Sequence, residues 1–426
     1  MISPLDDRYY DDVKCLVKYF GDDAYTIQRI NVEIRHFIEM SRILKLDINY
    51  TDINFRPINS NDIEKIKNYE KITNHDVKAI EYFLRDYLKE HIVDYKYDHL
   101  IHIGLTSQDI NSVAFSCNLK NGSFEIVKII NNLLEVVKKL KMKCVDIKMV
   151  ARTHGQPAIE MNMDNMIQYY YERINKQLTR IIVSIFDITA KFGGAVGNHN
   201  ALKFILPAVD WNEYSDNIVK IFGLIRNKYT TQIDSYDSYC NLLNDFKQLS
   251  IIIKDMNLNL WNYIKDKYFI QTVIKTETGS STMPQKINPI DFENSLGQIE
   301  MFIGMVESIT RSLSYSNYQR DIKDSTILRS FGETLGKFVI ALKKTIKGIS
   351  KLEPNKEFIL EELNNHPEIL MENIQTYLRF KGIDNAYEII KEFSRGNNIS
   401  KENIKKYIVN LDINIDKNEL LSLLIL

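Results

Sequence analysis

Glycine and proline are scarce in this sequence, and both residue types disfavour the interior of a helix. The 426 residues include 16 glycines and 8 prolines, about half of the number that average usage of about 7% and 5% would give. Neither residue occurs in residues 123–154, 158–192, 224–278 or 305–331. Uninterrupted stretches of this length predict long helices.

Net charge and long apolar runs are missing as well. The 55 Lys and Arg residues nearly balance the 56 Asp and Glu residues, which leaves a formal net charge of -1 and argues against nucleic acid as a partner. No stretch approaches the eighteen or so apolar residues of a membrane span, and the N-terminal MISPLDDRYYDD lacks the apolar segment of a secretory signal. We therefore expect a soluble, cytoplasmic protein with neither a nucleic-acid partner nor a membrane partner.

Cysteine is also rare, and its spacing excludes two classes of site. The four cysteines lie far apart without a CxxC pair, at Cys15, Cys117, Cys144 and Cys240. This spacing fits neither a disulfide framework nor a zinc site, so we expect free thiols in a reducing compartment. His99 and His102 are one turn apart but lack a third ligand, and we expect no metal there.

Apolar residues recur at steps of four and three in two of the long stretches, as in a coiled coil. In the first, Ser123 is expected to cap a helix after Gly122, and the seam comprises Ile126, Ile130, Leu133, Val137, Leu140, Cys144 and Ile147. The second seam comprises Leu242, Phe246, Leu249, Ile253, Met256, Leu260 and Tyr263. Helices of about thirty residues, roughly 45 Å long, with short connections form bundles. Seams on more than one face predict a homo-oligomer.

The regions on either side of these stretches differ in composition. Residues 1–96 read as shorter, more polar helices, and the chain becomes acidic and rich in asparagine after Pro354. The predicted fold is all-α, with a central domain of long bundled helices flanked by two smaller helical domains. The expected boundaries are 1–96, 97–350 and 351–426.

Two short motifs carry a histidine at a break in the helical pattern. ARTHGQPA, residues 151–158, places His154 beside a glycine and a proline between two long helices. An imidazole there is either a general acid or base, or a capping or buried structural histidine. TNHD, residues 73–76, forms a second break, where Thr73 or Asn74 is expected to cap the helix that follows.

GLTSQDIN, residues 104–111, has the pattern of a capped helix start. Thr106 or Ser107 is the expected cap, and Asp109 lies in the first turn. Amide and hydroxyl groups at such a point suit an anion, although a purely structural cap explains the pattern equally well.

The stretch GSSTMPQKINP, residues 279–289, gathers two hydroxyls, an amine and an amide between a glycine and prolines. Together with TSQDIN and ARTHGQPA, which precede it in the chain, it resembles the fumarase/aspartase superfamily of lyases, whose signature is GSSxMPxKxN. Further stretches are similar to the adenylosuccinate lyase branch: SPLDDRY, TNHDVKAIEYFL, GGAVGNHNA, YTTQI, NPIDFENS, QRDIKDSTILR and HPEILMENIQTYLR. The resemblance extends from Ser3 into the 370s.

The resemblance implies a β-elimination that releases fumarate by general acid–base catalysis. Ser280, on a mobile loop freed by Gly279, matches the base that removes a proton beside a carboxylate; Lys286 and Asn288 would stabilise the developing charge. His154 matches the acid that protonates the leaving nitrogen. His75 matches a second catalytic histidine.

The same resemblance implies a set of substrate-binding residues. Thr106 and Ser107 would hold the succinyl group, and Arg320, Ser325 and Arg329 would bind a phosphate with Arg8 and Tyr9. Without the resemblance, the RDxxxSxxxR pattern would be a solvated helix face. The remaining matched positions are Asn74, Asp76, Gln156, Gln232 and Ser281.

The expected reaction is the conversion of adenylosuccinate to AMP and fumarate, and also of the succinylated aminoimidazole carboxamide ribotide (SAICAR) to AICAR, in purine biosynthesis. The family implies a homotetramer with shared active sites and requires no cofactor. Asp7 stands where the family commonly has glycine, and Gln285 where it has histidine or tyrosine. Argininosuccinate lyase, aspartase, fumarase and a non-catalytic helical assembly are the alternatives.

Overall fold

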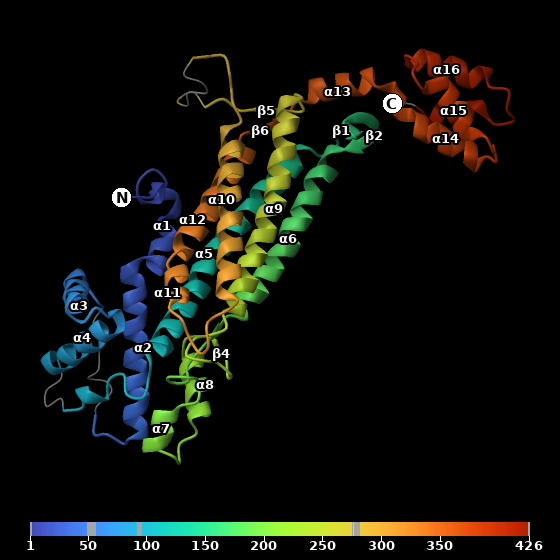
Figure 1. Ribbon diagram of the computed structural model, residues 1–426. Coiled ribbons are helices and arrows are strands. Elements are labelled where there is room, and N and C mark those ends of the chain that lie inside the picture. The colour runs from blue at the N-terminus through green and yellow to red at the C-terminus, as the bar shows by residue number, and fades with distance from the viewer. Residues whose placement is uncertain (1, 49–56, 92–95, 275, 277–281, 425–426) are drawn as a thin grey trace. The chain divides into compact units, whose positions relative to one another are not determined.

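The computed structural model describes residues 2–48, 57–91, 96–274, 276 and 282–424. The chain forms two compact units: unit 1 comprises residues 1–133, 174–255 and 293–346, and unit 2 comprises residues 134–173, 256–292 and 347–426. Helices dominate both units, and the strands are short (Figure 1). The prediction of an all-α protein with several domains is confirmed, while the three boundaries given above stay a prediction.

Unit 1 contains shorter helices that lie within it and parts of long helices that continue into unit 2. The shorter ones are α1 (Tyr10–Phe20), α2 (Asp22–Ile43), α3 (Ser60–Thr73), α4 (Asp76–His91), α7 (Asn200–Ile205), α8 (Trp211–Ile221) and α11 (Lys323–Leu328). The long ones are α5 (Ser107–Lys143), α6 (Met163–Phe186), α9 (Asp237–Lys265), α10 (Ile290–Leu313) and α12 (Phe331–Ser350). Strands β3 (Thr189–Ala190) and β4 (Ile225–Arg226) pair in parallel.

Aromatic side chains hold the long helices of unit 1 together. Phe302 of α10 stacks on Phe338 of α12 with ring centres 4.8 Å apart, and Phe246 of α9 contacts the same ring at 5.5 Å. Figure 1 shows α10 and α12 side by side. Each residue of the two predicted seams except the partly exposed Tyr263 is buried. Cys144 and Ile147, at the end of the first seam, lie beyond the last residue of α5.

One predicted helix start is wrong. Ser123 does not cap a helix, because α5 begins at Ser107 and runs through Gly122 without a break for 37 residues. A Cβ atom at Gly122 would lie 2.5 Å from a ring carbon of Phe20 in α1. This glycine is therefore a close-packing residue inside a helix and does not mark its end.

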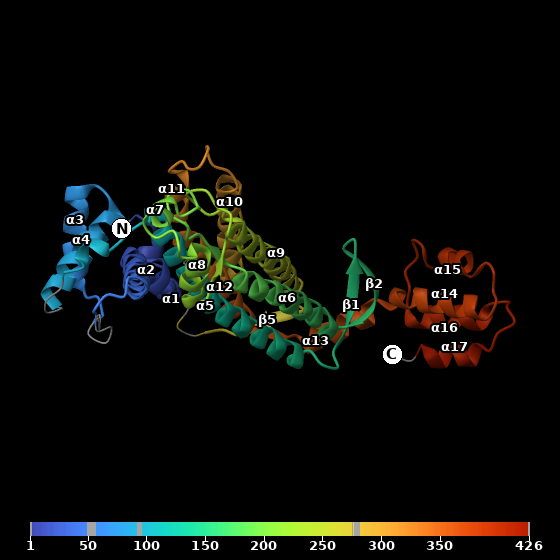
Figure 2. The same cartoon turned by 90° about the horizontal axis from the view of Figure 1, so that it is seen from below.

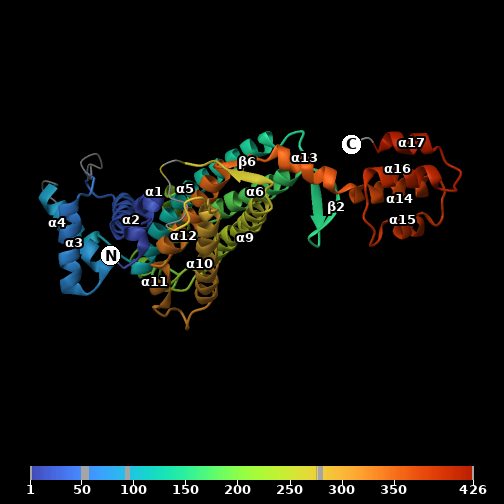
Figure 3. The same ribbon diagram turned by 90° about the horizontal axis from the view of Figure 1, so that it is seen from above.

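Unit 2 contains two antiparallel strand pairs and a small C-terminal helical cluster. Strands β1 (Lys148–Thr153) and β2 (Gln156–Asn162) are antiparallel, as are β5 (Phe269–Gln271) and β6 (Leu352–Pro354). The helices after β6 are α13 (Lys356–Asn365), α14 (Met371–Phe380), α15 (Ala386–Ser394), α16 (Lys401–Asn410) and α17 (Lys417–Leu423). Figures 2 and 3 both show α14 to α17 gathered together, around a core that includes Ile374, Leu378, Ile390 and Ile408.

The cysteines are free thiols, as expected: Cys117, Cys144 and Cys240 are buried and Cys15 is partly exposed. Burial raises the pKa of the Cys144 thiol to about 12, so this group stays protonated at neutral pH. Among the described residues, none of the helices has both the length and the apolar character required to cross a membrane.

Candidate active site

A cavity of about 380 Å³ in unit 1 brings together seven of the predicted site residues. They come from the α3–α4 junction, the start of α5 and the α11 segment, and they are Asn74, His75, Asp76, Ser107, Arg320, Ser325 and Arg329. The volume lies within the roughly 300–1,000 Å³ that is typical of small-molecule sites. Residues more than 200 positions apart in the sequence therefore line one cavity.

His75 lies at the tight junction between α3 and α4. Asn74 ends α3 in the left-handed conformation, with φ of 50°, and its N–H donates to Glu70 O. The imidazole Nδ1 of His75 accepts the Lys78 N–H at 3.2 Å and so caps the start of α4. The expected caps, Thr73 and Asn74, were therefore wrong for α4, since a histidine ring performs that role.

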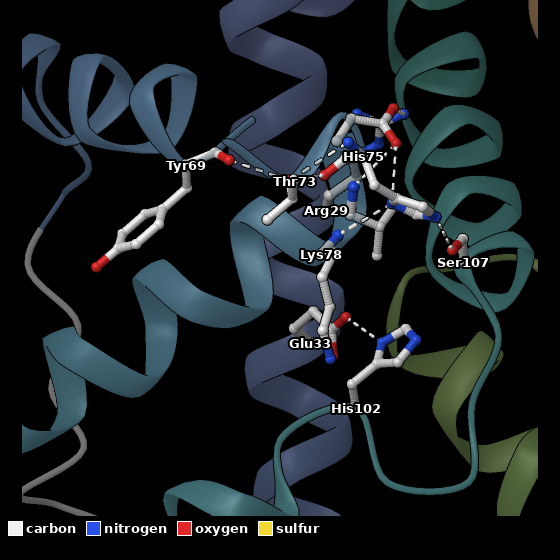
Figure 4. Close-up of polar contacts among 10 residues, drawn as sticks. Arg29, Glu33, Tyr69, Thr73, His75, Lys78, His102 and Ser107 are labelled. Carbon is white, nitrogen blue, oxygen red and sulfur yellow. Dashed lines mark hydrogen bonds and ion pairs between the residues drawn. The ribbon is translucent and has the colours of Figure 1, made fainter. Parts of the chain in front are cut away.

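This cap determines which nitrogen of His75 carries the proton. Because Nδ1 accepts a hydrogen bond, the neutral ring has its proton on Nε2, as assigned from the hydrogen-bond pattern. Nε2 lies 3.4 Å from Ser107 Oγ, and Figure 4 shows the ring directed toward that hydroxyl. The His75 ring thus presents an N–H donor to the cavity.

Asp76 and Arg29 form an ion pair at the cavity wall, with Arg29 Nη2 2.8 Å from Asp76 Oδ2. Burial alone would raise the pKa of Asp76, but the attraction of Arg29 and the Val77 N–H outweighs it, so the pKa lies below its usual value. Asp76 is therefore ionised at neutral pH. It fixes the first turn of α4 beside His75.

The start of α5 is confirmed at the predicted place, and a buried charge pair secures it. The Thr106 N–H donates to Asp109 Oδ2 at 2.8 Å. Asp109 Oδ1 lies 2.7 Å from Lys191 Nζ and accepts the N–H groups of Gly193 and Gly194. Asp109 and Lys191 are both fully buried, so GGAVGNHNA supports the helix that carries Ser107.

Replacing Lys191 by methionine is expected to destabilise the protein by about 3–5 kcal/mol, because it leaves the Asp109 carboxylate buried without its counter-charge. The urea concentration at the unfolding midpoint measures the effect. The matched control is Lys203→Met, the same change at an exposed lysine, which should alter stability by less than about 0.5 kcal/mol. Equal midpoints for the two variants would contradict the prediction.

The cationic side of the cavity comes from residues 320–329. Arg320 Nη1 donates to Gln232 Oε1 at 3.2 Å, so Gln232 contacts the cavity wall through this arginine. Ser325 lies in α11, and Arg329 follows the last residue of that helix. Two guanidinium groups and a hydroxyl suit a phosphate, since forked donors engage phosphate oxygens bidentately.

Several predicted site residues lie elsewhere. Arg8 and Tyr9 of unit 1 do not line this cavity; the Arg8 guanidinium lies 5.9 Å from the Tyr9 ring centre, and Asn294 Nδ2 donates to the Tyr9 hydroxyl. Thr106 contributes its backbone to Asp109, as described above. Ser280 and Ser281 lie outside the described residues.

Four further predicted residues belong to unit 2. His154 is exposed at the tip of the β1–β2 hairpin, where its φ of 53° and that of 75° at Gly155 form a two-residue turn. The predicted break between two long helices is present, and a strand hairpin forms it. Gln156 begins β2, and Lys286 and Asn288 precede α10, with Lys286 exposed.

Comparisons with known proteins identify the family of this chain. Residues 26–304 match the family model described as "Lyase", and residues 316–425 match "Adenylosuccinate lyase C-terminal". Adenylosuccinate lyase of Dictyostelium discoideum is 37% identical over 98% of this chain and 94% of its own length. The chain belongs to the adenylosuccinate lyase family. As a member of this family, it is an enzyme of the C–N lyase type that eliminates fumarate.

Other relatives support this family and its fold. Adenylosuccinate lyase of Escherichia coli K12 is 37% identical over 96% of this chain and 91% of its own length. The fold is shared with 3-carboxy-cis,cis-muconate lactonizing enzyme from Pseudomonas putida, with a TM-score of 0.77, 14% identity and coverage of 99% and 94% of the two chains. Fumarate lyase from Mesorhizobium sp. BNC1 gives a TM-score of 0.74 at 14% identity, over 90% and 86%.

In this adenylosuccinate lyase family member, further residues line the cavity that the sequence analysis did not name as site residues. They are Tyr19, Phe20, Asp22, Tyr25, Arg29, Glu70, Gln108, Asn111, Phe115, Ile322, Leu328 and Gly332. For Tyr25 and Arg29 the sequence did contain a signal. They are four residues apart on α2, a spacing that places both side chains on the same face of a helix. Their partners on other helices were not readable from the sequence.

Proposed function

We propose that this enzyme eliminates fumarate from adenylosuccinate to give AMP, and from SAICAR to give AICAR, as a cytoplasmic enzyme of purine biosynthesis. The observation that carries the proposal is the composition of one cavity. An imidazole N–H beside the hydroxyl of Ser107 lies at the same cavity as Arg320, Ser325 and Arg329. The His75 and Ser107 donors are complementary to a succinyl carboxylate. The two arginines and Ser325 are complementary to a nucleotide phosphate.

The proposed chemistry begins with a proton on the carbon beside a succinyl carboxylate. Ser280 takes this proton as the base, and the electron pair left behind forms the carbon–carbon double bond of fumarate as the C–N bond breaks. Lys286 and Asn288 stabilise the negative charge that builds on the carboxylate. His154 donates a proton to the departing nitrogen. His75 binds the substrate through its Nε2–H, with Thr106 and Ser107 at the succinyl group.

We propose further that the active form is a homotetramer in which subunits share each site. Arg8 and Tyr9 do not line the cavity of unit 1, which supports this. If they bind the substrate phosphate at such a cavity, another copy of the chain supplies them. His154, Gln156, Ser281 and Gln232 complete the proposed set. Asn74 and Asp76 hold His75 at the junction between α3 and α4.

Three substrates tested in parallel decide the function. Purified protein is assayed for fumarate release from adenylosuccinate, argininosuccinate and aspartate, and kcat/KM is compared. We expect turnover of adenylosuccinate alone, because neither alternative substrate carries a phosphate for Arg320 and Arg329. Preference for argininosuccinate or aspartate would overturn the proposed substrate, and silence with all three would favour a non-catalytic assembly.

Replacing Arg329 by glutamine is expected to raise KM for adenylosuccinate about 10- to 100-fold, since it removes a charged hydrogen-bond donor from the phosphate grip. The value of kcat should change little, because the phosphate is bound equally in the ground state and the transition state. Steady-state kinetics measure both values. Arg311→Gln, the same change at an exposed residue of α10 outside the cavity, is the control. An unaltered KM in Arg329→Gln would contradict the assignment.

A further inference from the structure

One face of α2 carries a row of polar side chains inside unit 1. Tyr25, Arg29, Glu33 and His36 follow at spacings of four, four and three, which place them on one side of the helix. We refer to these four residues as the polar stripe of α2. Glu33 and His36 are 0% exposed and Arg29 is 8% exposed. Buried charged groups need partners, so the partners of the stripe indicate its role.

Each member of the polar stripe contacts a segment that carries or adjoins a cavity residue. Tyr25 donates to Asn111 O of α5 at 3.3 Å, and Arg29 holds Asp76 at the start of α4. Glu33 Oε1 lies 2.6 Å from His102 Nδ1, and His36 Nε2 donates to Ile103 O at 3.0 Å. Figure 4 shows Glu33 of α2 joined to His102, and Ser107 close to His75.

His36 is a neutral anchor for the loop that precedes α5. Its Nε2–H donates to Ile103 O, and its Nδ1 accepts the Tyr214 hydroxyl at 2.7 Å. Burial lowers the pKa of His36 to about 3, so this ring remains uncharged at neutral pH. It therefore contributes hydrogen bonds and no charge to the loop.

His102 is the second anchor of the same loop, and it is held by a carboxylate. Its φ of 62° lies in the left-handed region, which is costly for a residue with a Cβ atom. Burial opposes the charged ring, but the attraction of Glu33 outweighs it, and the pKa of His102 is raised. The His102 ring meets only one oxygen of the Glu33 carboxylate, Oε1. The other oxygen, Oε2, has no hydrogen-bond partner among the described residues. The pair fixes the loop four residues before Thr106.

We propose that Glu33 is a positioning residue for the elimination reaction: through His102 it fixes the loop at residues 101–106 and hence the Ser107 hydroxyl against the Nε2–H of His75. Arg29, one turn earlier on the same stripe, positions His75 from the other side through Asp76. A single helix thereby sets the distance between two substrate-binding groups that come from different segments. This inference rests on the proposed function, because the displaced groups are those assigned to the succinyl part of the substrate.

The test compares Glu33→Gln, His102→Gln and the double variant with the parent enzyme. Each single variant is expected to lower kcat with adenylosuccinate about 10- to 100-fold, since a displacement of about 1 Å at a reacting centre has effects of this size. The dissociation constant of AMP should stay within about twofold, because Arg320, Ser325 and Arg329 belong to a different segment. The kcat of the double variant should be no lower than that of the slower single variant, because both changes affect the same contact between Glu33 and His102.

The matched control is Glu39→Gln on the same helix. Glu39 is partly exposed and pairs with Arg35 and Arg42 of the same helix, so kcat should remain that of the parent. If Glu33→Gln fails to fold, His102→Gln decides alone, because that side chain is 18% exposed and its loss leaves α2 intact.

Three outcomes would overturn the inference: kcat within about twofold of the parent in both single variants, AMP binding lost in parallel with kcat, or losses that multiply in the double variant. The second of these would indicate a general structural role. The failure of the proposed function is a separate result, since the parent enzyme itself would then release no fumarate from adenylosuccinate.

Discussion

Replacing Ser280 by alanine is expected to lower kcat about 10²- to 10⁴-fold, the usual contribution of a general base. The change removes the proposed proton acceptor but leaves Arg320, Ser325 and Arg329 in place, so adenylosuccinate should still bind. Fumarate release measures turnover, and equilibrium binding of adenylosuccinate to the variant measures whether its affinity is retained. Turnover lost with binding retained is the pattern of a residue that acts in the transition state.

Two results would contradict this assignment. Near-normal turnover in Ser280→Ala would show that another group removes the proton. Loss of turnover in Ser281→Ala together with an active Ser280→Ala enzyme would move the base to the neighbouring serine. The pair is informative because the two variants make the same chemical change one residue apart on the GSSTMPQKINP stretch.

The second large effect is expected for His75→Asn, which should reduce kcat about 10²-fold or more. Asparagine is a good helix N-cap, so its amide oxygen can accept the Lys78 N–H in place of Nδ1 and preserve the start of α4. The shorter side chain cannot place a donor where Nε2 now meets Ser107. The variant therefore separates the capping role of the ring from its role in the cavity.

Kinetics and thermal unfolding together check this separation. We expect the loss of turnover to occur with a Tm close to that of the parent. His99→Asn makes the same change at an exposed residue and should leave both values unaltered. A fully active His75→Asn enzyme would reduce His75 to a structural cap, and a matching fall in Tm and kcat would attribute the loss to misfolding.

Much of the fold was predictable because it depends on local patterns. The scarcity of glycine indicates helices, the spacing of apolar residues along α5 and α9 reports the helical period, and the residues of the two seams are buried except Tyr263. Gly122 shows the limit of such patterns. Whether a glycine ends a helix or permits close packing depends on what approaches it, and the ring of Phe20 comes from more than 100 residues earlier in the chain.

The candidate site divides in the same way. Motif residues such as His75, Ser107 and Arg329 were found from the sequence, and the structure places them at one cavity. The hairpin that carries His154 was missed because ARTHGQPA lies between long helices and its strands are short. The polar stripe of α2 was missed because Glu33 and His36 have the spacing of a buried face but the polarity of an exposed one. Only their partners, His102 and Ile103, reveal why they are buried.

The measurement that tests the central claim most directly is the product balance of the reaction. Purified protein is incubated with adenylosuccinate, and AMP and fumarate are quantified by chromatography over time. A β-elimination predicts that one AMP and one fumarate form for each adenylosuccinate consumed. Adenylosuccinate that remains intact, or AMP formed without an equal amount of fumarate, would contradict the proposed reaction.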